Sequence, residues 1–337
     1  MKINIVSFLL CLLTINGFAQ DTKLMEYVKR GIILHDEGKY DQAIKEYKKA
    51  LKIDKKSALV HYEIAYAYNE LGDKKAALKH VNKALKGKGS EELPMLYVMK
   101  GNFLDDAGEA KQAIKVYEEG LRRFPNFYML YFNMGITYSR MDMPDNAKNA
   151  FINAISNEFG YPSSHYYLGE LMEMQGRKIP AIMSYYFFLM LEPETIRADG
   201  IYDRLMNLLF KSESEKGNKK IEINLGDSDM SDLEFASMEL LLHLDVAKES
   251  EEETPKTDTE KLIAKTTLLF STMKEKKETN KGIWWDFYAP FYAKMFDCEV
   301  ITTFCYHIGQ SKGGNIALWL EGHGEEVTEF VECVNKE

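Results

Sequence analysis

The sequence predicts an all-α protein built mainly from a repeated helix-turn-helix unit, and two ladders of small residues predict it. The first ladder has intervals of 34, 36, 34 and 34 residues: Gly31, Ala65, Gly101, Gly135 and Gly169. The second keeps the same four intervals: Ala43, Ala77, Ala113, Ala147 and Ala181. One two-residue insertion in the run 86–90 accounts for the longer interval in both. A shared period of this length predicts a stacked array of structural repeats.

The chain begins with the features of a secretory signal. Lys2 precedes an apolar run over residues 3–15, and small residues stand at Gly17 and Ala19. The run is shorter than the roughly 20 apolar residues that a membrane span needs. We therefore expect a signal peptide over residues 1–19, cleavage after Ala19, and a protein of the periplasm or cell envelope that does not span a membrane. Cys11 lies within the apolar run instead of after a lipobox, which favours a soluble exported protein.

Each repeat contains two apolar stripes at helical spacing, separated by a break. In the first repeat Tyr27 and Leu34 mark one stripe, Gly38 marks the break, and Tyr47 and Leu51 mark the second stripe. The turn residues of the five repeats are expected to end a helix in the left-handed conformation: Gly38, Gly72, Gly108, Asp142 and Gly176. The predicted repeats are 24–57, 58–91, 94–127, 128–161 and 162–195.

These residues resemble the tetratricopeptide repeat (TPR) family over residues 24–193. The resemblance implies a right-handed α-solenoid of about five units, each a pair of antiparallel helices. Aromatic residues of the second helices are expected to fill the space beside the small residues: Tyr47, Tyr117, Phe151 and Tyr185. Lys55, Gly89 and Phe159 stand where the family often has a closing proline, which affects only the sharpness of a turn.

The resemblance also implies a binding face, because TPR proteins generally bind peptides or helices along the first helices of their repeats. Carried over to this sequence, the expected partner-binding positions are Tyr62, Tyr66, Asn69, Glu70, Asn102, Asp105, Asp106, Phe132, Arg140, Tyr166, Glu170 and Glu173. The face is aromatic and acidic, which favours a basic protein or peptide partner. Val28, Ile32 and Glu63 replace the Lys and Asn of a carboxylate clamp, which excludes that subclass. The alternative is that the acids are only solvated and the tyrosines pack between helices.

After Pro193 the period is lost. Residues 194–212 form one amphipathic stripe, which predicts a helix that caps the last repeat. A polar linker is expected over 213–230, with a short strand-like run over 221–225. A C-terminal helical module is expected over 231–337, with helices over about 231–248, 260–278, 315–320 and 325–334. An acidic linker, residues 249–259, interrupts this module.

The run 283–292 is the densest aromatic cluster of the chain and includes Trp284 and Trp285. Its helical spacing predicts burial in a small core. The alternative is an exposed patch that contacts a glycan or a membrane surface.

Two patterns near the C-terminus invite a chemical interpretation. Residues 309–313 match the G-x-S-x-G nucleophile elbow around Ser311, but His323 follows without any aspartate. Cys305 and His307 offer neither the number nor the spacing of zinc ligands. We therefore predict no catalytic site, no metal site and no cofactor. The alternative is a hydrolase-like module with Ser311 or Cys305 as the nucleophile.

Charge and cysteine content restrict the partners further. The formal net charge of the 337-residue chain is -9, which argues against a nucleic-acid-binding protein. Removal of the signal leaves three cysteines, Cys298, Cys305 and Cys333, so at least one thiol has no partner within the chain. We expect that thiol to be a small buried hydrophobe, the alternative being a bond to a second chain.

Overall fold

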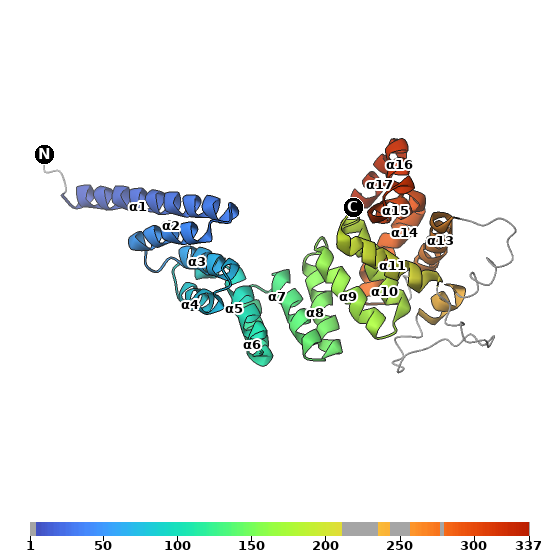
Figure 1. Ribbon diagram of the computed structural model, residues 1–337, viewed down its shortest axis with the longest axis horizontal. Coiled ribbons are helices and arrows are strands. Elements are labelled where there is room, and N and C mark those ends of the chain that lie inside the picture. The colour runs from blue at the N-terminus through green and yellow to red at the C-terminus, as the bar shows by residue number, and fades with distance from the viewer. Residues whose placement is uncertain (1–4, 211–234, 243–256, 277–279, 337) are drawn as a thin grey trace. The chain divides into compact units, whose positions relative to one another are not determined.

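The computed structural model describes residues 5–210, 235–242, 257–276 and 280–336. These residues form helices and turns, with one isolated β-bridge between Ser57 and Lys88 in place of any sheet. The predicted linker 213–230, with its strand-like run 221–225, lies outside the described residues, as do residues 249–256 of the predicted acidic linker. The chain forms two compact units, 1–150 and 151–337, and the boundary falls within one helix (Figure 1).

The first unit is a succession of antiparallel helix pairs. Its helices are α1 (Ile5–Asp36), α2 (Tyr40–Ile53), α3 (Ala58–Glu70), α4 (Lys74–Ala84), α5 (Met95–Asp106), α6 (Ala110–Arg123) and α7 (Tyr128–Arg140), and α8 (Pro144–Asn157) crosses the boundary. A short 3-10 turn, Ser90–Glu92, begins at the last residue of the run 86–90 that contains the predicted insertion. α1 packs on α2, α3 on α4 and α5 on α6, and each second helix also contacts the next first helix. Within the described residues, no helix is both long and apolar enough to cross a membrane.

The turns between paired helices have the predicted left-handed backbone. Gly38, Gly72, Gly108 and Gly176 have φ of 73°, 76°, 79° and 72°. Asp142 adopts φ of 55° at the same position, a conformation that a short polar side chain tolerates better than most. The five turns are therefore equivalent although one of them lacks glycine.

The ladder of small residues is explained by tyrosine packing. A Cβ atom on Gly31 or Gly101 would overlap the ring of Tyr47 or Tyr117, 16 residues further along the chain. Where the ladder has Ala65, the residue 16 positions later is the smaller Val81, and both are fully buried in one cluster. Glycine is therefore paired with a large tyrosine and the larger alanine with a smaller valine, so that each pair fills its space, as close packing requires.

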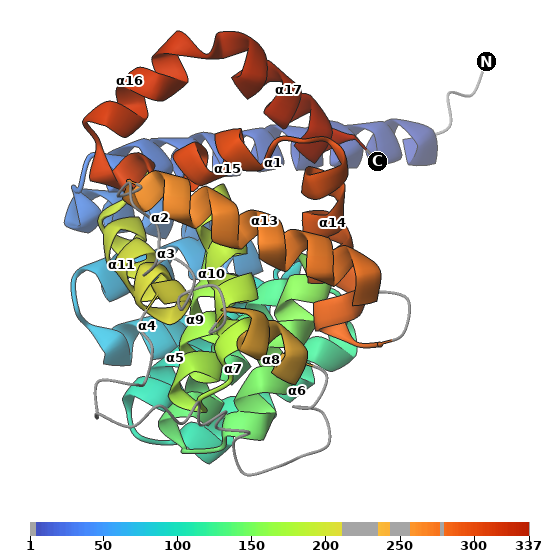
Figure 2. The ribbon, with the colours of Figure 1, turned by 90° about the vertical axis from the view of Figure 1, so that its right-hand side faces the viewer.

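The second unit surrounds one buried helix. Its elements are α9 (Pro162–Met174), α10 (Lys178–Leu191), α11 (Ile196–Phe210), a helix over 235–242, α13 (Asp258–Lys276), the π-helical turn η4 (Trp284–Tyr288), α14 (Ala289–Asp297), α15 (Ile301–Ile308), the 3-10 turn η5 (Gln310–Lys312), α16 (Asn315–Gly322) and α17 (Gly324–Asn335). Every residue from Ile179 to Leu189 is buried, because α9, α11, η4 and α15 all pack on α10. Figure 2 shows α16 and α17 meeting at an open angle near the end of the chain. The predicted capping helix and the described helices of the C-terminal module thus share one core with the last repeat.

The aromatic cluster belongs to this core, as its spacing predicts. Tyr288 and Tyr292 are fully buried, and the Trp284 and Trp285 side chains are only 6% and 1% exposed. The Tyr292 hydroxyl donates to the Met183 carbonyl of α10 at 2.5 Å. The alternative of a glycan or membrane patch on the two tryptophans is therefore wrong, since neither indole presents a free face to solvent.

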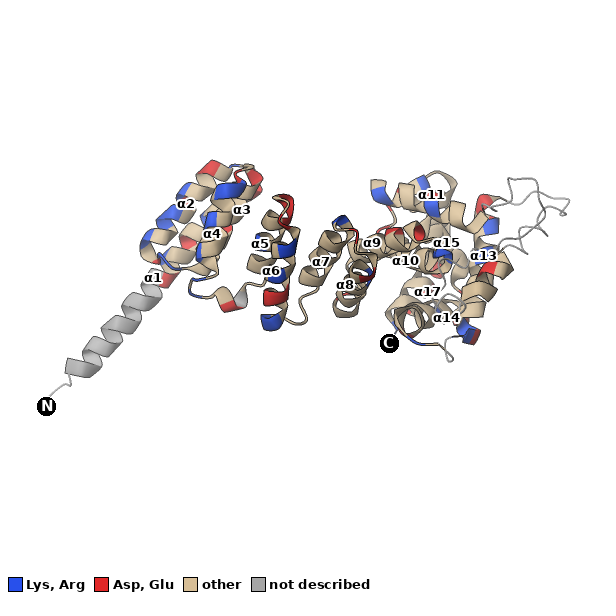
Figure 3. Cartoon of the chain, turned by 90° about the horizontal axis from the view of Figure 1, so that it is seen from below, with Lys and Arg blue, Asp and Glu red and all other residues tan. Residues whose placement is uncertain are grey.

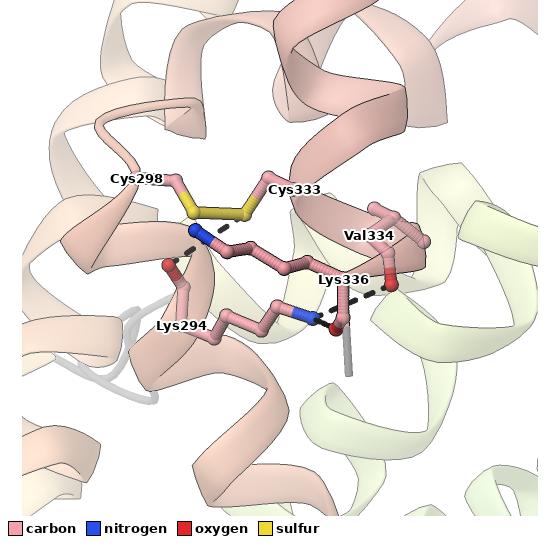
Figure 4. The surroundings of a disulfide bond; sticks show 5 residues. All are labelled: Lys294, Cys298, Cys333, Val334 and Lys336. Carbon is pink, nitrogen blue, oxygen red and sulfur yellow. Dashed lines mark hydrogen bonds between the residues drawn. A yellow bond between two sulfur atoms is a disulfide. The ribbon is translucent and has the colours of Figure 1, made fainter.

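The three cysteines of the second unit are accounted for within the chain. Cys298, just after α14, forms a disulfide with Cys333 of α17 (Figure 4). Next to this bond the Lys294 ammonium donates to the carbonyls of Val334 and Lys336, so α17 is held at two points. Cys305 is the unpaired thiol and is buried in α15, as expected for a small hydrophobe. Burial raises the pKa of the Cys305 thiol to about 12.

Candidate functional site

The most exposed aromatic residue of the predicted binding face is Tyr66 of α3, and Tyr62 on the same helix is half-buried. The Tyr62 and Tyr66 rings stack with centroids 6.4 Å apart, and the Tyr66 ring also stacks on His35 of α1 at 4.7 Å. Tyr66 is 41% exposed, and Ile32 beside His35 on α1 is 38% exposed. We call Ile32, His35, Tyr62 and Tyr66 the tyrosine face. It combines rings held in place by stacking with a surface that solvent reaches.

Acidic groups accompany the tyrosine face without a cation of their own. Glu63 accepts a hydrogen bond from the Tyr47 hydroxyl at 3.3 Å, and burial raises the pKa of its carboxyl. Glu70 is exposed and accepts from the Asn69 amide at 3.4 Å. No Lys or Arg of the described residues forms an ion pair with Glu63 or Glu70. A cationic side chain of a partner would therefore find uncompensated carboxylates beside the rings.

The predicted positions of the third and fourth repeats are instead bound to other residues of the first unit. Asn102 accepts from the Tyr117 hydroxyl at 2.7 Å. The Asp105 carboxylate is only 6% exposed and forms an ion pair with Arg140 of α7. Asp106 pairs with Lys74 at 2.6 Å. The negative charge expected here is therefore neutralised within the chain. Phe132, also on α7, is half-buried.

In the fifth repeat the predicted face is covered by α11. The Arg204 guanidinium lies 2.5 Å from a Glu170 oxygen and 2.8 Å from a Glu173 oxygen. The same carboxylates accept hydroxyl hydrogen bonds from Tyr166, at 3.2 Å, and Tyr185, at 2.6 Å. Arg204 also lies over the Tyr185 ring, 5.3 Å from its centroid. These three predicted positions thus hold the capping helix in place.

Three cationic residues that contact the predicted binding face, Arg204, Arg197 and Lys74, were not predicted from the sequence. Arg204 follows Glu170 by 34 residues, one repeat length, so the ladder itself contained the signal. Arg197 is a second such residue on α11, with its guanidinium 5.5 Å from the Tyr166 ring centroid. Lys74 begins α4 and reaches α5, a contact that no periodic pattern indicates.

The chemical patterns near the C-terminus do not assemble a reactive group in the structure. Ser311 lies in η5, and its buried hydroxyl has no hydrogen-bond partner among the described residues, so no base activates it. The residues that lead to it form α15. The His307 ring is held by the Met190 carbonyl at 2.9 Å and by the Gln310 side chain at 2.9 Å. In the part of the chain that the structure describes, no three His, Cys, Asp or Glu residues could hold a metal ion together.

The repeats are the part of the chain that matches known protein families. Residues 31–86 match a family model described as TPR repeat, and residues 96–127 match one described as tetratricopeptide repeat. No curated protein matches the sequence.

Three solved structures of low sequence identity are similar to this chain, and the first of them shares its fold. The structure of pilF from Pseudomonas aeruginosa is 20% identical, with a TM-score of 0.51 over 69% of this chain and 100% of that one. A thermophilic TPR protein from Thermus thermophilus is 21% identical, with a TM-score of 0.45 over 55% of this chain and 98% of that one. YrrB, described as a TPR protein with an unusual peptide-binding site, is 20% identical, with a TM-score of 0.40 over 52% and 90%. Because family models of this repeat match residues 31–86 and 96–127, the repeats of this chain belong to the tetratricopeptide repeat family.

Proposed function

We propose that the protein is an exported scaffold that binds a basic segment of a partner protein on the tyrosine face of α1 and α3. The observation that carries the proposal is the exposed Tyr66 ring, stacked on the half-buried Tyr62 ring, beside uncompensated acids. Stacked rings offer a large contact area with little side-chain entropy to lose on binding.

The preference for a basic segment is supported by the chain's own contacts. On the first helices of later repeats, Asp105 binds the guanidinium of Arg140, and Glu170 and Glu173 bind that of Arg204. Around Tyr62 and Tyr66 the carboxylates of Glu63 and Glu70 remain available for the same interaction. A partner that supplies Lys or Arg there would repeat a contact already present twice in the molecule.

Export is supported by two features of different kinds. The first 19 residues have the composition of a secretory signal. The Cys298–Cys333 disulfide is of a type that forms and persists in oxidising compartments. A periplasmic or envelope location is therefore part of the proposal.

The test compares capture of a partner by the full protein and by variants of α3. Tyr62→Ala combined with Tyr66→Ala should lower the affinity for a captured partner, or for an Arg-rich peptide derived from it, at least about tenfold. Tyr68→Ala is the matched control, because Tyr68 lies on the same helix but packs toward α2 and α4, with its ring 5.7 Å from that of His80. Equal affinities for the wild type and the Tyr62/Tyr66 variant would overturn the assignment of the tyrosine face.

A further inference from the structure

A second surface of the first unit has the opposite charge. Residues 45–88 contain twelve lysines against five acidic residues, a net charge of +7 in a chain whose net charge is -9. In Figure 3, blue segments, which mark Lys and Arg, occur repeatedly along α2 and α4. Such a concentration of like charge opposes folding through mutual repulsion unless an anion offsets it.

Part of this charge lines a pocket between the end of α2, the start of α3, α4 and the turn after α4. Its lining residues are Leu51, Lys55, Lys56, His61, Lys79, Asn82, Lys83, Lys86 and Gly87, which we call the lysine pocket. It contains five lysines and no acidic residue. None of the five lysine side chains forms an ion pair with a described carboxylate. The pocket is therefore cationic and uncompensated.

The backbone holds the two lysine-bearing turns together. The Lys88 amide donates to the Lys56 carbonyl at 2.8 Å, and the Ala58 amide donates to the Lys88 carbonyl at 2.9 Å. A Cβ atom on Gly87 would collide with the Lys56 carbonyl, so glycine is required for this close approach. The two-residue insertion that lengthens one interval of the ladder supplies this second turn. The backbone of the repeat therefore forms the pocket before any ligand binds.

One histidine, His61, lines the lysine pocket, and its ring pairs with that of His80. His61 is 5% exposed, and its Nε2 donates to the Lys55 carbonyl at 3.2 Å, so its Nδ1 must accept from His80 at 3.0 Å. Burial and the nearby charges of His61 and Lys83 lower the pKa of His80 to about 4. Both rings are therefore neutral at pH 7, and they report on any anion that enters.

We propose that the lysine pocket binds the phosphate group of an anionic ligand, either a free phosphate compound or the headgroup of an anionic phospholipid. A phosphate monoester carries a charge of roughly -1.5 to -2 and three acceptor oxygens on one compact group, so several ammonium groups can share it. A carboxylate carries one charge and two oxygens and would leave more of the lysines uncompensated. This site is independent of the tyrosine face and of a basic partner there.

The experiment titrates the full-length protein with sodium pyrophosphate at pH 7 while the histidine ring signals are followed by NMR. The expected result is a saturable shift of the His61 and His80 signals. Charge reversal by Lys79→Glu with Lys83→Glu should weaken pyrophosphate binding at least about tenfold. Lys115→Glu is the matched control, since Lys115 occupies the position of Lys79 one repeat later and is exposed on α6. Lys55→Glu with Lys86→Glu provides a second variant if the first pair does not fold.

Two further arms distinguish the ligand source. Co-sedimentation with vesicles that contain phosphatidic acid, whose headgroup is a phosphate monoester, supports a lipid headgroup if both charge reversals abolish it. Binding of pyrophosphate without vesicle binding supports a free phosphate compound. The proposal is overturned if pyrophosphate gives no saturable shift, if Lys115→Glu weakens binding as much as the pocket variants, or if polyglutamate of matched charge binds more tightly and thus indicates an acidic protein.

Discussion

The Nδ1 atom of His165 lies 2.6 Å from the hydroxyl oxygen of Tyr288, and the contact joins α9 to the π-helical turn η4. The other ring nitrogen, Nε2, lies 2.8 Å from the Phe159 carbonyl, which can only accept. The proton of the neutral ring therefore sits on Nε2, and Nδ1 accepts from Tyr288. His61 makes the same bond to a carbonyl six residues earlier, that of Lys55. A buried, neutral histidine thus fixes the turn before its helix in two repeats.

This contact predicts acid sensitivity of the second unit. Burial lowers the pKa of His165 from its usual 6.5 to about 3, so the folded state resists protonation more than the unfolded state does. The contribution of His165 to stability is complete above about pH 6.5 and is lost as the pH falls toward 3. We expect the free energy of unfolding to fall by about 2 to 3 kcal/mol between pH 7 and pH 4 on this account. Urea unfolding at the two pH values measures it.

The matched comparison uses His165→Gln and His323→Gln. The first variant should be less stable at pH 7 but lose less stability on acidification, because glutamine does not titrate. The second replaces a histidine that stacks on Trp319 near the surface. A pH dependence in His165→Gln equal to that of the wild type would contradict the assignment.

The packing of Tyr185 on Gly169 predicts opposite effects for two glycine substitutions in the same unit. A Cβ atom on Gly169 would lie 2.5 Å from the ring of the fully buried Tyr185, whereas one on Gly200 in α11 would meet no atom within 4 Å. Gly169→Ala should destabilise the unit by about 1 to 3 kcal/mol through overpacking. Gly200→Ala should stabilise it by up to about 1 kcal/mol through helix propensity. Thermal unfolding of both variants measures these two changes in stability. A stabilising Gly169→Ala would refute the packing explanation.

The disulfide between Cys298 and Cys333 predicts that these two cysteines stabilise the fold, whereas the buried Cys305 keeps an unreactive thiol. Cys298 and Cys333 enclose a loop with a sequence separation of 35, so replacing both by serine should cost about 3 kcal/mol. Cys305 should stay unreactive toward a thiol reagent in the folded, unreduced protein, because it is buried and its thiolate is disfavoured. Urea unfolding of the double-serine variant measures the stability cost, and thiol counting before and after unfolding tests the state of all three cysteines. Rapid labelling of Cys305 in the native protein would be inconsistent with its burial.

The cover of the last repeat by α11 predicts a role for Arg204. Arg204→Ala removes its contacts with Glu170 and Glu173 and should lower stability by about 1 kcal/mol, a modest effect because the ion pairs are partly exposed. Asn207→Ala, at an exposed position of the same helix, should leave stability nearly unchanged. Denaturation midpoints of the two variants are compared, and equal midpoints would argue against a capping role for Arg204.

Export predicts the first residue of the mature protein. Cleavage after Ala19 would leave Gln20 at the N-terminus, which N-terminal sequencing of the protein from its native cells determines. A chain that keeps Met1 would contradict the expected signal peptide.

The repeat architecture was predictable because each ladder residue reports a local packing requirement. Gly31 must be small for Tyr47, and Gly38 must adopt a left-handed backbone, so both restrictions appear directly in the sequence. Burial of Trp284 and Trp285 was also predictable from helical spacing. The position of the described C-terminal helices on α10 was not, because it depends on contacts such as Tyr186 with Thr266, 80 residues apart.

The candidate site was predictable only in part, for a related reason. Periodicity locates the first helices and hence Tyr62 and Tyr66, but it does not show which carboxylates are already bound. Asp105 and Asp106 form ion pairs with Arg140 and Lys74, which come from neighbouring helices. The pairing of Cys298 with Cys333 likewise depends on where α14 and α17 meet, and the spacing of the cysteines does not specify it.

The burial of α10 on all sides restricts how this array can change its length. A repeat can be duplicated only where both of its neighbours present a repeat-like surface to the new copy. α10 presents its outer surface to η4 and α15 instead, so a copy inserted after it would displace the rest of the unit. Natural or engineered lengthening is therefore confined to the repeats before α9, and the C-terminal end of the array is a fixed terminus.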